Sequence, residues 1–120
     1  MAFIKLDPEW VQLPTDKAEA EANKSAVCPE YLIGPLSLAE RELVMNLLGA
    51  KEVPWGSIVM AQARAGLRGW RNVPGSVAFK ADKDGRVTEE QLGMLDHRTL
   101  QEIAREVWSR STLSEANRGN

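Results

Sequence analysis

Cys28 and His97 are the first side chains to consider for chemistry, because a thiol and an imidazole can act together as nucleophile and base. They are the one cysteine and the one histidine of the chain, and Pro29 follows the cysteine directly. No predicted helix begins at Cys28 to lower the pKa of its thiol. We therefore expect Cys28 to be a small, half-buried side chain and His97 to be exposed in a first helical turn. The two residues are also poor material for a zinc site.

Aspartates surround a glycine in the segment 82–90, as they do in calcium-binding loops. If Gly85 took the sixth position of such a loop, Lys80 would stand at the first ligand position and Gln91 at the twelfth. The lysine ammonium would repel a cation, and the glutamine would replace the bidentate glutamate. We therefore interpret Asp82–Gly85 as a hairpin turn and expect no metal site.

Other catalytic patterns are equally weak. Paired carboxylates such as Glu89 and Glu90 stand at predicted helix starts, where they complement the helix dipole. The spacing of Gly66 and Gly69 lacks the lysine and the third glycine of a phosphate-binding loop. We therefore expect no catalytic residues and no cofactor, and we predict that the chain is not an enzyme.

Tryptophan and arginine gather in one stretch that contains no acidic residue, from Val53 to Ala81. The cations of this stretch are Arg64, Arg68, Arg71 and Lys80. A helix would place the three arginines on one face, because they are spaced four and three residues apart. Tryptophan and arginine often carry the binding energy of protein interfaces. The predicted partner-binding surface consists of Trp55, Arg64, Arg68, Trp70 and Arg71.

Two other interpretations of this stretch stay open. The tryptophans could form a core pair beneath a solvated arginine face. The same side chains could instead stack on bases and contact phosphates, which would make the chain a small helical nucleic-acid-binding regulator. The net charge of −2 for the whole chain argues against nucleic acid as the partner.

Capping signals and apolar spacing place the helices that would carry these residues. Ser37 and Glu40 form a capping box, and the helix that follows is predicted to run to about Leu48. A second helix is predicted from residue 55 to about residue 68. The strongest helix begins after Asp96. Its apolar stripe consists of Leu100, Ile103, Ala104, Val107 and Trp108.

The remaining segments complete a mainly α-helical domain of about four helices. Residues 1–14 are predicted to be an extended lead-in, because two prolines exclude a continuous helix. Residues 15–30 are predicted to be a mobile loop or a frayed helix, since this segment has no apolar stripe. A short β-hairpin is predicted near 76–88. A capping box at 88–91 opens a further short helix.

Composition limits the class of protein. The chain has 120 residues, 43% of them hydrophobic and 27% charged, which suits one packed domain, predicted over 1–113. Residues 114–120 are predicted to be a disordered tail. No apolar run approaches the ~20 residues of a membrane span, and the N-terminus lacks the apolar core of a signal peptide. We therefore expect a soluble intracellular domain without disulfides.

Five motifs follow one another along almost the whole chain, with a short leucine-bearing helix before the last of them. They are Leu6–Trp10, Tyr31–Ser37, Leu67–Trp70, Asp84–Val87 and Ser111–Asn117. In this order they resemble the tail assembly chaperones of long-tailed, lambda-like bacteriophages. The Gly69–Trp70 pair, the Asp-Gly turn before a capped helix and the exit from the last helix carry most of the resemblance.

The resemblance implies a non-catalytic function. A tail assembly chaperone binds the long, aggregation-prone tape measure protein in the host cytoplasm while the tail tube polymerises, and it is absent from the mature virion. Members of the family self-associate, and many also occur as a longer form, made by ribosomal frameshifting, that recruits the tail tube protein. Codons are not visible in a protein sequence, so frameshifting stays open here. A structural tail or connector component is a further alternative.

Overall fold

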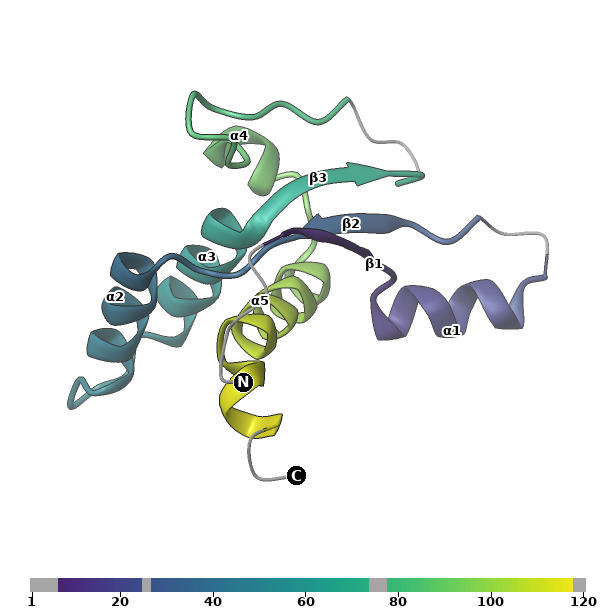
Figure 1. Cartoon of the computed structure of the whole chain (residues 1–120). Coiled ribbons are helices and arrows are strands. Elements are labelled where there is room, and N and C mark those ends of the chain that lie inside the picture. Colours follow the sequence, from purple (N-terminus) through teal and green to yellow (C-terminus); the bar gives the residue numbers. More distant parts are fainter. Residues whose placement is uncertain (1–6, 25–26, 74–77, 118–120) are drawn as a thin grey trace.

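The computed structural model describes residues 7–24, 27–73 and 78–117, and within these residues it contains five helices and a three-stranded antiparallel sheet (Figure 1). The elements in chain order are β1 (Glu9–Val11), α1 (Pro14–Ala22), β2 (Glu30–Ile33), α2 (Leu38–Leu48), α3 (Trp55–Gly66), β3 (Leu67–Arg71), α4 (Glu89–Leu92) and α5 (His97–Asn117). In the view of Figure 1, α5 lies below the sheet and α4 lies above β3.

The sheet shows that the predicted mainly α-helical fold is wrong. β1 lies in the predicted lead-in, β2 begins at the end of the segment predicted as a loop over 15–30, and β3 lies partly inside the helix predicted over 55–68. Each strand has between three and five residues. Strands this short carry little local signal, since their stability comes from partners that are distant in sequence.

β2 is the central strand and pairs with both neighbours. Tyr31 of β2 pairs with Val11 of β1 on one side and with Trp70 of β3 on the other. The register between β2 and β3 then shifts, so that Arg68 is an extra residue between the pairs that β3 makes with Leu32 and Ile33. Arg68 is thus the additional residue of a β-bulge, a feature that bends a strand and redirects its side chains.

The second predicted helix ends earlier than expected, at Gly66, and β3 follows without a loop. Two glycines, Gly66 and Gly69, weaken the helical conformation here. The carbonyl of Gly66 accepts a hydrogen bond from the backbone N–H of Gly34 at 2.9 Å, so it already belongs to the sheet. Arg68, Trp70 and Arg71 therefore lie on a strand and not on a helix.

The predicted hairpin is reduced to a turn and one β-bridge, between Ala81 and Val87. The turn itself forms as the Asp-Gly signal indicates, with Gly85 at a φ of 80°. The side chain of Gln91 hydrogen-bonds to backbone groups that precede the bridge. Its Oε1 accepts from Lys80 N at 2.6 Å, and its Nε2 donates to the carbonyl of Ala78 at 2.7 Å. A side chain therefore takes the place of a second strand. Residues 76 and 77 of the predicted hairpin lie outside the described residues.

The predicted helix starts are confirmed where a cap was identified. Ser37 and Glu40 make the reciprocal hydrogen bonds of a capping box, at 3.2 and 2.8 Å. Thr88 caps α4 by accepting from Gln91 N, but the predicted capping box is not completed, because the Gln91 side chain binds residues 78 and 80 instead. Asp96 caps the start of α5 by accepting from Thr99 N at 2.8 Å. α5 continues to Asn117, so helix extends into the segment predicted as a disordered tail. Residues 118–120 of that segment lie outside the described residues.

α1 forms a helix where the sequence predicts a loop or a frayed helix, although none of its residues is buried. It is held to α5 by polar contacts. The backbone N and the Oγ1 of Thr15 donate to Glu102 Oε1 at 3.1 and 2.7 Å, so a carboxylate from α5 caps the start of α1. Arg98 forms ion pairs with Asp16 and Glu19 at 3.9 and 3.4 Å.

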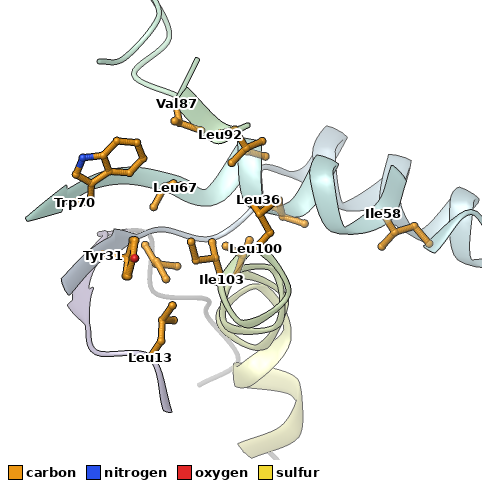
Figure 2. Packing of buried hydrophobic residues seen from close by; sticks show 14 of the residues in the cluster. Leu13, Tyr31, Leu36, Ile58, Leu67, Trp70, Val87, Leu92, Leu100 and Ile103 are labelled. Carbon is orange, nitrogen blue, oxygen red and sulfur yellow. The ribbon is translucent and has the colours of Figure 1, made fainter. Parts of the chain in front are cut away.

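The core lies where α5 and α3 meet the sheet, and Figure 2 shows Leu36, Leu100 and Ile103 converging there. Within this core, Ser111 is fully buried. Its Oγ donates to the carbonyl of Val107 at 2.7 Å and accepts from Leu36 N at 2.8 Å. This hydroxyl therefore joins the last turns of α5 to the chain that leaves β2.

Candidate functional site

A groove of about 340 Å³ lies between α3 and α5, beside the end of α2. Its apolar lining consists of Leu48, Trp55, Ile58, Val59, Ala104 and Trp108. Three polar side chains, those of Gln62, Gln101 and Arg105, also line it. Apolar grooves between two helices are a common docking site for a third amphipathic helix.

α3 and α5 are brought together by a glycine. A Cβ atom placed on Gly66 would lie 2.5 Å from Val107 Cγ1 and 2.9 Å from Val107 Cβ, and closer still to Cγ2. Val107 is fully buried. The backbone of α3 can therefore contact α5 at this point because residue 66 has no side chain. The α3 residues that line the groove all precede this contact.

Trp55 is the first residue of α3, and its side chain is 64% exposed. It shares a helix face with Ile58 and Val59, which lie three and four residues further on and contribute to the same groove. Most soluble proteins do not expose a tryptophan to this degree, because its large apolar surface is costly to leave in water. Trp55 is therefore a candidate anchor for a partner.

α5 supplies the opposite wall of the groove. Hydrogen bonds from the side chain and backbone of Thr99 lower the pKa of Asp96, which keeps this helix cap ionised. About two turns after this cap, Ala104 faces α3 across the groove, and Trp108 follows about one turn further on. The sequence pattern assigns Trp108 to the core stripe, but the structure leaves its side chain half-buried. Its position at the end of the stripe, beside Arg105 on the polar face, is the signal that could have suggested a binding role.

The structure separates the five residues of the predicted partner-binding surface. Trp55 lines the groove between α3 and α5. Trp70 is 9% exposed and packs edge-on against Phe79, with ring centroids 5.0 Å apart, so it belongs to the core. Arg68 is half-buried at the β-bulge and donates to the carbonyl of Pro35 at 3.4 Å. The predicted surface assumes that one helix carries this segment. In the structure α3 ends at Gly66 and β3 begins at Leu67, so the five residues do not share a helix face.

Two of the four cations in the acid-free stretch form ion pairs with carboxylates from elsewhere in the chain. Arg64 forms an ion pair with Glu89 at 2.7 Å. Arg71 forms one with Glu30 at 2.8 Å, and its guanidinium lies 4.0 Å from the ring centre of Trp10. The tertiary structure therefore reduces the positive charge that Arg64 and Arg71 present to a partner.

A second groove, also of about 340 Å³, lies between α2, α3 and the turn at 82–86. Glu40 and Arg86 form an ion pair at 2.9 Å in its wall. Burial raises the pKa of Glu40, but hydrogen bonds from Arg86 and Ser37 outweigh this effect and hold the pKa below its usual range. This ion pair connects the start of α2 to the turn. Arg64 lines this second groove, away from Trp55.

The candidate nucleophile has an unfavourable environment. Cys28 is half-buried and its Sγ lies 3.5 Å from the carbonyl oxygen of Pro29. Burial raises the pKa of the Cys28 thiol, which disfavours the reactive thiolate. His97 is exposed at the start of α5, as predicted. Among the described residues there is no group of three or more His, Cys, Asp or Glu side chains placed to hold a metal ion.

The chain matches no protein-family model, and comparisons with curated proteins and with solved structures return no match. Within the described part of the chain, no helix combines the length and the hydropathy needed to cross a membrane.

Proposed function

We propose that this chain is a non-catalytic tail assembly chaperone, which binds helical segments of a phage tape measure protein in the groove between α3 and α5. The observation that supports this most directly is the exposed Trp55 at the mouth of an apolar groove whose other wall carries Trp108. The order of motifs that resembles tail assembly chaperones supports the choice of partner.

A tape measure protein is a long helical rod, and its apolar stripes aggregate until the tail tube encloses them. A small groove covers a short part of such a stripe, so one copy of the chaperone would bind weakly. Many copies on one rod would act together, because each bound copy raises the effective concentration of the next interaction. Self-association of this chain would add to the same effect.

We propose that the protein acts in the host cytoplasm and leaves before the virion is complete. A longer frameshifted form, if the gene encodes one, would bring tail tube protein to the coated rod. The ion pairs of Arg64 and Arg71 weaken the nucleic-acid alternative, since these arginines already contact carboxylates.

The test is co-expression with the tape measure protein of the same phage. The soluble fraction of that protein should rise in the presence of this chain. Trp55→Ala should reverse most of the gain, because truncating a central aromatic anchor weakens binding by about 2 kcal/mol or more. Trp10→Ala is the matched control, since Trp10 is also an exposed tryptophan but lies on the sheet.

Three outcomes would contradict the proposal. The first is a tape measure protein that stays equally insoluble with and without this chain. The second is recovery of the chain in stoichiometric amounts from purified virions, which would indicate a structural tail component. The third is retention on duplex DNA that weakens steeply with salt, which would indicate a nucleic-acid-binding protein.

A further inference from the structure

Arg105 differs from the other arginines of the described chain. The side chains of the other seven each donate a hydrogen bond to a carboxylate or a backbone carbonyl; they are Arg41, Arg64, Arg68, Arg71, Arg86, Arg98 and Arg110. Arg105 is exposed on α5, lines the groove between α3 and α5, and makes no hydrogen bond or ion pair with any described residue. An unpaired cation therefore stands in the wall of an otherwise mostly apolar groove.

Gln62 is a second polar group in this groove that has no partner among the described residues. Its side chain is on α3 and the residue is 7% exposed. Its side-chain amide is not completely enclosed by the protein, so solvent in the groove can reach it. Gln91 differs in this respect: it is 3% exposed, and both ends of its amide are hydrogen-bonded within the protein. The amide of Gln62 is therefore a polar group at the surface of the groove, beside Arg105 in the same lining.

We infer that the groove recognises an acidic amphipathic helix, with apolar side chains against Trp55 and Trp108 and a carboxylate paired with Arg105. This inference rests on the proposed function and specifies the chemistry of the bound segment. Arg105 and Trp108 are three residues apart on α5, so they lie on neighbouring turns of one face. The carboxylate of the partner helix therefore lies about one turn from its apolar anchor.

The acidic helix α1 of a second copy is a poor occupant. It carries Asp16, Glu19 and Glu21, but its sequence contains no large apolar residue to fill the space between the tryptophans. α2 of a second copy exposes Leu43 and Met45 beside Glu42, so a second copy is one outcome of the test below. The occupant that we infer is a helix from another protein, as in the proposed function.

The experiment uses two designed helical peptides of two to three turns, identical except for one position that is Glu in the first and Lys in the second. Both carry leucines at i, i+4 and i+7, with the variable residue one turn from the first leucine. Binding to the full chain is followed by tryptophan fluorescence, to which Trp55 and Trp108 contribute two of the four tryptophans of the chain. The Glu peptide should bind at least tenfold more tightly than the Lys peptide. Arg105→Glu should reverse this preference, whereas Arg64→Glu, outside the groove, should leave it unchanged.

The inference is overturned if the native chain binds both peptides equally, if neither binds at millimolar concentration, or if Arg105→Glu keeps the preference for the Glu peptide. Loss of the preference together with a change in oligomeric state would assign the groove to a second copy and would also overturn it. These results are separable from a failure of the proposed function. A chain that selects the Glu peptide but does not solubilise the tape measure protein would be a helix-binding module with a different partner.

Discussion

Gly66→Ala should separate α3 from α5 and destabilise the fold. The added Cβ would lie 2.5 Å from Val107 Cγ1 and 2.9 Å from Val107 Cβ, well inside van der Waals contact, and Val107 has no free space to move into because it is fully buried. Overpacking of this kind costs typically about 1–3 kcal/mol. Gly66 ends α3, so the gain in helix propensity offsets only part of this. We expect a net loss of about 2 kcal/mol, or roughly 8 °C in Tm for a chain of this size.

Urea denaturation followed by circular dichroism measures this loss, and a double-mutant cycle tests its cause. Val107→Ala alone should cost about 2 kcal/mol through lost packing. The same change removes both γ carbons from the site of the clash, so Gly66→Ala and Val107→Ala together should cost clearly less than the sum of the two. A double variant whose loss equals the sum within about 0.5 kcal/mol would refute the steric reasoning. Gly56→Ala is the control: it lies in the same helix, nothing stands within 4 Å of its added Cβ, and it should be neutral or slightly stabilising.

Three further changes test other parts of the structure. Ser111→Ala should lower the free energy of unfolding by about 1–3 kcal/mol, because it leaves a buried backbone N–H unpaired, whereas the exposed Ser109→Ala should change it little. Glu40 has a lowered pKa in the folded chain, so its contribution to stability is present at neutral pH and is lost as the pH falls through that pKa. Glu40→Gln should therefore make Tm depend less on pH below neutrality. A variant whose Tm falls with acid as steeply as that of the native chain would argue against this ion pair. Glu102→Ala removes the cap of α1, so trypsin should cleave after Lys17 faster than in the native chain while the Tm of the remaining fold changes by only a few degrees.

Local signals in the sequence predict the helix starts well. Ser37, Thr88 and Asp96 all cap the helices that the sequence places after them, because a capping hydrogen bond forms within three residues and needs no tertiary partner. The apolar stripe of α5 is confirmed in the same way, since Leu100, Ile103 and Ala104 are buried. Interactions between near neighbours in the chain are visible in the order of residue types.

The sheet and α1 could not be predicted because their stabilising contacts are distant in sequence. Tyr31 pairs with Val11 and Trp70, at separations of 20 and 39 residues, and no pattern inside any one strand indicates these partners. α1 has no apolar stripe, so its helix depends on the carboxylate of Glu102, which accepts from Thr15 and lies 87 positions after it in the chain. Hydrogen bonds of this kind have no signature in a local window of sequence.

The prediction of the candidate site depended on whether the helix continues past Gly66. A helix that continued past this residue would place Arg64, Arg68 and Arg71 on one face, and a basic surface would follow from the spacing alone. In the structure the chain becomes a strand at residue 67, and the same glycine brings α3 into contact with α5. The end of the helix therefore disperses the arginines and at the same time forms the groove that contains Trp55. Gly66 thus links fold and function: a substitution that restores helix propensity there should disrupt the contact that shapes the binding groove.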